Sequence, residues 1–195
     1  MAGHLAIAKI ALSKRHRSLP DPMDGHRDIW FDVTIDVENR GDVPLYVIDE
    51  LRGIAFDAAT RVLSLRLCES QPQPVQQDAP TFHLPPPHTL TVDRRATASI
   101  VVKIPLVLKE LRLGAGGVLS MEQTDMSTMK TIRCEVASSD RPIEDRGAET
   151  AHELRSRLGT WGKVVSKDAA VDPDLRDSQA GQTPDGPDPK KLKKR

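Results

Sequence analysis

The chain has 195 residues, with 28 Lys and Arg against 28 Asp and Glu, so its formal net charge at neutral pH is zero. This balance argues against a protein that binds nucleic acid or an anionic membrane with its whole surface. No stretch approaches the roughly 20 apolar residues that a membrane-spanning helix needs. Apolar residues make up 38% of the chain and 15 residues are prolines, which predicts one domain with extensions outside its core.

The N-terminal segment MAGHLAIAKIALSKRHR lacks the order of a secretory signal, because its basic cluster follows the apolar residues and Lys9 interrupts them. We therefore expect a cytoplasmic protein. In a reducing compartment Cys68 and Cys134 are expected to be buried free thiols, with a disulfide between the sheets as the alternative. The preference for Arg over Lys and for Asp over Glu, with many Ala and Pro residues, points to a GC-rich bacterial genome.

Short strands dominate the first two thirds of the chain. Segment 5–12 is a candidate first strand, and segment 29–38 (IWFDVTIDVE) alternates apolar and polar residues with the period of two of a half-buried strand. Further strands are predicted at 45–49, 54–56, 62–68 and 129–137, and two more on either side of a charged turn at 93–95. Segment 106–117 (LVLKELRLGAGG) is ambiguous between a helical turn and a strand, and its glycines indicate a loop rather than a phosphate site.

The segment 32–47, DVTIDVENRGDVPLYV, resembles the strand–turn–strand of bacterial immunoglobulin-like domains. The resemblance implies an all-β fold, an immunoglobulin-like antiparallel β-sandwich over residues 1–140, and carries no shared catalytic residues. An amphipathic helix extension is expected at 141–165, with the helix itself at about 145–160 and its N-terminus favoured by acidic residues at 144–145. Residues 166–195 contain so few apolar side chains that a disordered tail is expected there.

The predicted helix carries Leu154, Leu158 and Trp161 on one face. One interpretation is that this face covers an edge or an open end of the sheets. The alternative is that it docks into a groove of a partner protein. A sheet edge that adds a strand from a partner is a further candidate contact.

The tail changes from acidic to basic, because six aspartates at 166–189 precede a terminal KKLKKR. A basic block of this kind binds nucleic acid, acidic lipid or an acidic protein surface, or it remains solvated. No aromatic residue lies between its charges, so stacking on bases is not offered. The candidate contacts are Lys190, Lys191, Lys193, Lys194 and Arg195.

Two other features of the first strands are candidate contact sites. The tripeptide Arg40-Gly41-Asp42 is predicted to be a turn, with a positive φ at Gly41 and a side-chain cap from Asn39 or Asp42, and not an adhesion signal. The polar face of 30–38 is acidic, and a flat strand face does not converge on a calcium ion. Trp30 lies among these acids and is a candidate partner contact or packs against the N-terminal segment.

No motif for catalysis, phosphate binding or zinc is found, and the six histidines and the methionines at 121–129 fit loops and core gaps better than sites. We therefore expect no enzyme, cofactor or metal. The predicted function is a non-enzymatic protein-interaction or scaffold module of a larger assembly. The alternatives are a nucleic-acid-associated accessory protein held by its basic end and, less favoured, a hydrolase or metal enzyme with a site built from loops.

Overall fold

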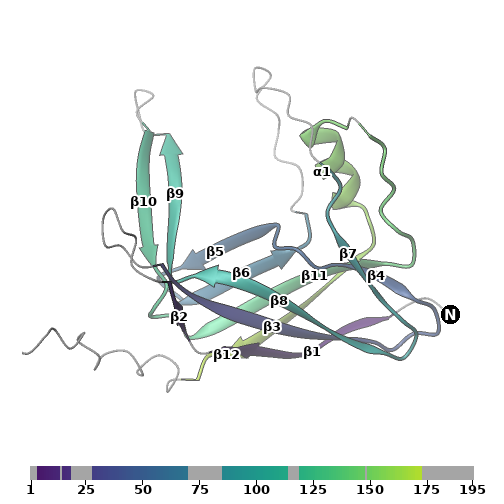
Figure 1. Cartoon of the computed structure of the whole chain (residues 1–195), viewed down its shortest axis with the longest axis horizontal. Helices are drawn as coiled ribbons and strands as arrows, with labels where there is room; N and C mark the ends of the chain where they lie inside the picture. Colours follow the sequence, from purple (N-terminus) through teal and green to yellow (C-terminus); the bar gives the residue numbers. More distant parts are fainter. Residues whose placement is uncertain are drawn as a thin grey trace, which may run out of the picture.

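A computed structural model describes residues 4–13, 15–18, 28–69, 85–113, 119–147 and 149–172, and the description below concerns these residues. The fold is mostly β-strand with one short helix (Figure 1). The first sheet, sheet A, contains β1 (Leu5–Leu12), β2 (His16–Arg17), β3 (Ile29–Asn39) and β8 (Thr97–Pro105). The second, sheet B, contains β4 (Leu45–Ile48), β5 (Gly53–Asp57), β6 (Val62–Leu67), β7 (Thr89–Val92), β11 (Thr131–Ser139) and β12 (Lys163–Ala170).

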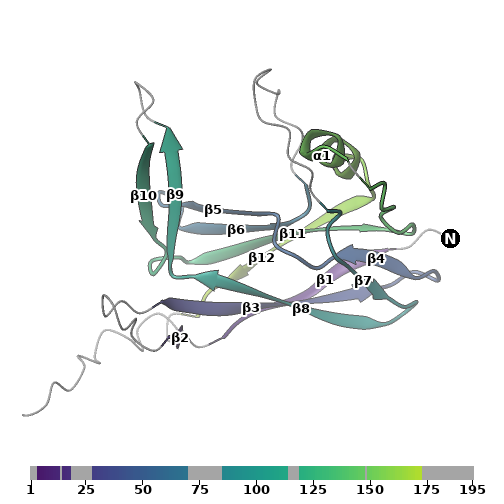
Figure 2. The ribbon, with the colours of Figure 1, turned by 45° about the horizontal axis from the view of Figure 1, so that its top comes forward.

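Three elements lie outside these two sheets. Strands β9 (Val107–Leu113) and β10 (Leu119–Asp125) form a two-stranded sheet of their own, and α1 (Ala151–Gly159) is the helix. Figure 2 shows sheet B lying over sheet A, with the β9–β10 hairpin rising at one end of the molecule and α1 near the other. The expected strands are thus present, and segment 106–117, left open by the sequence, is mainly strand.

The core lies between the two sheets because alternate residues of the central strands face inward. In β3, Phe31, Val33 and Ile35 are almost completely buried, as the period of two predicts. Sheet B contributes Leu63, Leu65 and their neighbours on β11 to the same cluster. Burial of such side chains contributes about 1.5–3 kcal/mol each, so this cluster is the main source of stability.

Asn39 is a polar residue that is completely buried at the end of β3. Its side-chain amide nitrogen donates to the backbone oxygens of Val43 (2.8 Å), Val92 (3.1 Å) and Asp93 (3.1 Å), and its oxygen accepts from the amide of Gly41 (2.9 Å). A buried side-chain amide without hydrogen bonds would destabilise the fold, and these bonds satisfy it. They also join the end of β3 to the end of β7.

The purely antiparallel arrangement that the sequence led us to expect is wrong for one pair of strands. Strands β6 and β11 are parallel, with Leu65 opposite Cys134, and every other strand pair in the described ranges is antiparallel. A parallel pair needs a long crossover, which the segment between 67 and 131 supplies. The direction of the β6–β11 pairing could not be derived from residue alternation, because parallel and antiparallel strands show the same alternation.

The C-terminal boundaries expected from the sequence also differ from the structure. Helix α1 spans 151–159 rather than about 145–160, and β12 occupies 163–170, where the end of the helix extension and the start of the disordered tail were expected. Strand β12 is held by backbone pairing along β11 and by the side-chain pair Arg133–Asp168 (2.8 Å), neither of which needs apolar residues. Residues 173–195 lie outside the described residues.

Both cysteines are buried free thiols, as predicted. Burial raises the pKa of the Cys68 thiol to about 11 and that of the Cys134 thiol to about 12. Cys134 lies opposite Leu65, three residues before Cys68, so strand geometry places the two Cα atoms roughly 11 Å apart. Disulfides need Cα atoms closer than about 7 Å, so these cysteines do not pair in this fold.

Candidate functional site

The β9–β10 hairpin, residues 107–125 and called the arm below, stands away from the two packed sheets (Figures 1 and 2). Its strands pair with each other along seven residues, from Val107 opposite Asp125 to Leu113 opposite Leu119. Within the described ranges neither strand pairs with a third. Because an isolated two-stranded hairpin is only marginally stable in water, this arm is an unusual element to leave uncovered.

The base of the arm is firmly attached to the body. The amide of Leu106 donates to the oxygen of Ile29 (2.8 Å), and the oxygen of Leu106 accepts from the amide of Met126 (3.0 Å). The side chains of Leu106, Met126 and Met129 are buried in the core, so the prediction that the methionines fill core gaps is confirmed at 126 and 129. The arm therefore starts from a fixed point.

Met121 differs from the other two methionines of its segment, because its side chain is 58% exposed on the arm. The pairing register places Leu111 opposite Met121, and Lys109 opposite Gln123 one step nearer the body. An exposed, flexible thioether is the type of side chain that adaptable contact surfaces use. The arm thus offers an exposed apolar contact position at Met121.

Trp30 lies in a pocket of about 610 Å³ at the base of the arm. This Trp30 pocket is lined by Ser18, Asp28, Ile29, Trp30, Lys103, Pro105, Leu106, Val107, Lys109 and Gln123. The indole stacks on the ring of His16 with centroids 5.6 Å apart, and the Lys103 ammonium lies 3.9 Å from the centroid of the indole ring. Trp30 therefore packs against the N-terminal segment, which was one of its two predicted positions.

The charges of the Trp30 pocket are unequally compensated. His16 is 3.1 Å from the carboxylate of Asp32. Neither Lys103 nor Lys109 has an ion pair with a described side chain, although Lys103 makes a cation–π contact with Trp30. An apolar and aromatic pocket with two such ammonium groups is suited to a ligand that carries negative charge beside an apolar group.

The rest of the acidic face of β3 is compensated by its neighbours. Asp36 accepts a hydrogen bond from the hydroxyl of Ser99 (2.6 Å), and Glu38 pairs with Arg40 (2.8 Å). These contacts support the interpretation of an ordinary solvated face.

The Arg40-Gly41-Asp42 tripeptide forms the turn after β3. Asn39 caps it through the amide of Gly41, and Asp42 forms an ion pair with Arg95 (2.9 Å). The predicted positive φ at Gly41 is wrong, since the positive-φ glycines of the described chain are Gly147 and Gly162. The side-chain cap from Asn39 makes the turn without a left-handed residue.

Helix α1 buries the face that the sequence identified. Leu154 is 0% exposed, Leu158 is 3% exposed, and Trp161 is partly buried against the core. A partner could reach the two leucines only if the helix left its place. Their positions fit the covering role that was one of the two predicted interpretations.

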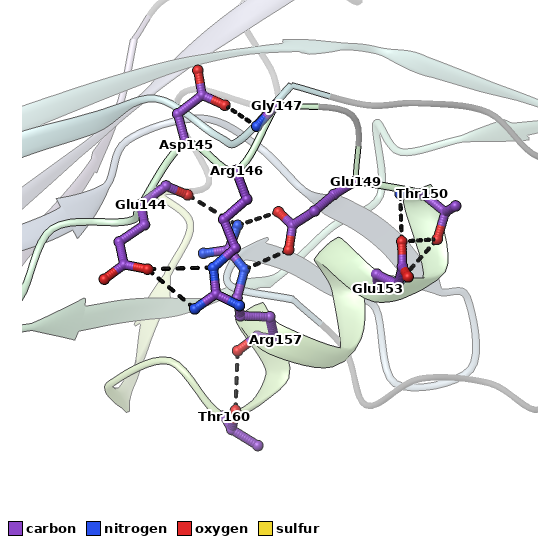
Figure 3. A network of polar contacts seen from close by, with 9 residues as sticks. All are labelled: Glu144, Asp145, Arg146, Gly147, Glu149, Thr150, Glu153, Arg157 and Thr160. Atoms are coloured by element: carbon purple, nitrogen blue, oxygen red, sulfur yellow. Dashed lines mark hydrogen bonds and ion pairs between the residues drawn. The ribbon is translucent and has the colours of Figure 1, made fainter.

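The ends and the exposed face of α1 are held by polar contacts. Thr150 and Glu153 form a capping box at the N-terminus, and Arg157 bonds both Glu149 and the backbone oxygen of Glu144 (Figure 3). Arg155 is 3.4 Å from Glu69, at the end of β6. The cap was readable from the sequence TAHE, whereas the acidic residues 144–145 that we expected at the N-terminus lie before it.

No group of three His, Cys, Asp or Glu side chains in the described ranges is arranged as a metal site would require. His88 forms a surface pair with Asp49 (2.7 Å), and hydrogen bonding to that carboxylate raises the pKa of His88. In the described part of the chain, no helix is both long and apolar enough to cross a membrane. The predicted basic contacts at 190–195 lie outside the described residues.

Comparison with known proteins identifies no relative: no family model matches the chain, and no curated protein or solved structure is significantly similar to it. The site is therefore defined by its own geometry. Trp30 was found from the sequence, whereas Lys103 was missed, and the favoured prediction that Met121 fills a core gap is wrong. Lys103 meets Trp30 only because β3 pairs with β8, and no short-range pattern reports that pairing.

Proposed function

We propose that this chain is a non-enzymatic protein-interaction module that holds a partner at the arm and the adjoining Trp30 pocket. The observation that carries the proposal is the exposed Met121 on a hairpin that neither sheet covers. A partner would cover this hairpin and add the packing that an isolated pair of strands lacks. The fixed base at Leu106 would present the arm in one orientation and so reduce the entropic cost of binding.

The Trp30 pocket, which lies at the base of the arm, supports the same proposal. Its volume of about 610 Å³ lies in the range of pockets that accept small groups or anchoring side chains. Aromatic residues such as Trp30 are common at the centre of protein interfaces, where they bury a large area at little entropic cost. The proposed partner therefore contacts an apolar arm and places a side chain beside Trp30.

The finer parts of the sequence prediction remain proposals. The two sheets and their common core are compatible with an immunoglobulin-like sandwich. The parallel β6–β11 pair departs from the antiparallel pairing of that fold. A scaffold role in a bacterial assembly follows from the same reasoning as the interaction module. Binding of nucleic acid by residues 190–195 is a separate hypothesis, tested by removing those six residues.

The test is site-specific photo-crosslinking in the native host with the full chain. A photoreactive residue replaces Met121 in one variant and Val164 on β12 in the other, because these two side chains are equally exposed, at 58% and 56%. The proposal expects a discrete protein adduct from position 121 and none from position 164. Met121→Lys should remove the partner from affinity-purified full-length chain, while Val164→Lys should retain it.

Two results would contradict the proposal. One is the same set of adducts from both positions, which would show non-specific contact. The other is an arm that gives no adduct while the purified chain keeps its partner after Met121→Lys.

A further inference from the structure

We infer that the open edge of β8 binds an extended, acidic segment of another protein by β-strand addition. The inference rests on the proposed function, because it names a class of partner for an interaction module. It concerns the edge of β8 and not the arm, and although Lys103 of β8 also lines the Trp30 pocket, substitutions at Val101 and Met121 test the two proposals separately. The argument starts from the hydrogen bonds that fix which side of β8 is open.

Two hydrogen bonds at the ends of the β3–β8 ladder show which residues of β8 direct their backbone N–H and C=O groups toward β3. The amide of Asn39 donates to the oxygen of Ala96 (2.9 Å), and the amide of Leu106 donates to the oxygen of Ile29 (2.8 Å). In an antiparallel pair only every second residue pair exchanges backbone hydrogen bonds. The residues that bond β3 are therefore those at even positions, and the N–H and C=O groups of the others point to the opposite edge. These others are Thr97, Ser99, Val101 and Lys103, with the carbonyl of Pro105.

Pro105 agrees with this assignment. Proline has no N–H, so it is tolerated in a strand where that group would face an open edge rather than a partner. Within the described ranges β8 pairs with β3 and with no second strand. The odd-numbered positions of β8 therefore present a regular row of backbone groups that no strand in the described ranges pairs.

The other two long edges, those of β1 and β12, lie side by side, and the remaining edges are shorter. The ammonium of Lys167 on β12 donates to the backbone oxygens of Ile7 (3.2 Å) and Ala8, which blocks the edge of β1 at its bulge. Strands β5 and β7 have five and four residues. Natural sheets normally protect long edges with lysine, proline or bulges.

The edge of β8 has such residues only at its C-terminal end. Its first six residues, TASIVV, carry no charge, and the side chain of Val101 is 60% exposed. Lys103 lies near the C-terminal end of this edge, with its ammonium 3.9 Å from the centroid of the Trp30 ring. A stretch of this composition pairs readily with another strand. This leaves the central part of the edge open to one.

The side chains along the edge indicate the chemistry of the incoming strand. An apolar residue would lie beside Val101, and an acidic residue beside Lys103, whose ammonium has no ion pair with a described side chain. A second copy of this chain would offer no acid there, because its own β8 carries Thr, Ser, Val and Lys on this face.

The experiment uses a displayed library of random octapeptides selected on the full chain. We expect enriched peptides that alternate apolar residues with Asp or Glu. Val101→Pro removes an N–H that faces the open edge and leaves the β3 ladder intact, so it should weaken a selected peptide by on the order of tenfold or more. The matched control is Val164→Pro on β12, whose N–H faces away from β11 by the same argument and whose side chain is equally exposed, so it should leave peptide binding unchanged.

A second measurement needs no substitution. In the wild-type chain the amides of Thr97, Ser99 and Val101 should exchange with solvent deuterium rapidly, and the bound peptide should slow them, while amides of the arm stay unchanged. The inference is overturned if no peptide is enriched, if binding survives Val101→Pro, or if the chain forms a dimer that Val101→Pro dissociates. Met121→Lys should not affect the peptide, so a failure of the arm proposal is seen separately.

Discussion

Helix α1 and the arm both lie outside the two sheets and both carry apolar residues, yet the fold treats them in opposite ways. The helix buries Leu154 and Leu158, caps its N-terminus with Thr150 and pairs its exposed charges. The arm is attached through its base at Leu106 and leaves Met121 exposed. The buried leucines of the helix therefore stabilise the chain itself, whereas the arm leaves the side chain of Met121 accessible to another molecule.

This difference shows how to separate structural from functional apolar residues. The sequence left two interpretations of the amphipathic helix, a cover for the sheets or a docking element, and the burial of its two leucines fits the first. A two-stranded hairpin gains little from its own pairing, and we propose on that ground that its exposed apolar residue contacts another molecule. Substitutions in the two regions should consequently affect different quantities, namely the free energy of unfolding for the helix and partner binding for the arm.

The largest expected effect is at the turn that joins α1 to β12. Gly162 has φ +76°, and a Cβ there would lie 2.1 Å from the backbone oxygen of Ser138. Gly162→Ala should therefore lower the free energy of unfolding by about 4 kcal/mol or more, measured by urea denaturation. Gly147→Ala is the matched control, because Gly147 has φ +71° but open space around it, and about 1–2 kcal/mol is expected. Equal losses would show that contact with Ser138 does not constrain the turn.

The direct comparison of helix and arm is the next largest. Leu154→Ala should lower the free energy of unfolding by about 3 kcal/mol, because it leaves a cavity under a completely buried side chain. Met121→Ala should change it by less than about 0.5 kcal/mol, since that side chain is mostly exposed. Urea unfolding of both variants measures the difference. Similar losses in the two variants would contradict the division between a structural helix and an available arm.

Several parts of this fold follow from local sequence patterns. The alternation of IWFDVTIDVE gives the buried face of β3, because side chains of a strand alternate between its two sides. The spacing of Leu154 and Leu158 gives the buried face of α1, and the capping-box sequence TAHE marks where the helix begins. Such features depend on neighbours within a few residues.

Other parts depend on residues that are distant in the sequence. Strand β12 lacks the apolar alternation of the central strands and is a strand because β11 offers it backbone partners and Arg133 pairs with Asp168. The arm was ambiguous because VLKELRL satisfies the spacing of a helix as well as that of a strand. The Trp30 pocket needs β2, β3, β8 and both strands of the arm to meet, so a pattern along one segment identifies Trp30 but not Lys103.

A smaller effect is expected at the N-terminus of the helix. The side-chain oxygen of Thr150 accepts a hydrogen bond from the amide of Glu153 (3.2 Å). Thr150→Ala should lower the free energy of unfolding by about 1 kcal/mol in urea denaturation, because a helix amide loses its partner. Thr150→Ser keeps the oxygen and should restore most of the loss. No difference between the two variants would mean that the cap does not contribute to stability.

The smallest effect is the pH dependence of the ion pair on the helix. Hydrogen bonding to Arg157 lowers the pKa of Glu149 from its usual value of 4.5. A carboxylate whose pKa is lower in the folded state stabilises the fold above its unfolded pKa and loses this contribution as the pH falls through the folded value. The difference in thermal midpoint between wild type and Glu149→Gln should therefore be constant near neutral pH, decrease below pH 4.5 and vanish in stronger acid. In an Arg157→Gln background the difference should be small at every pH, and a pH dependence that persists there would assign the effect to another group.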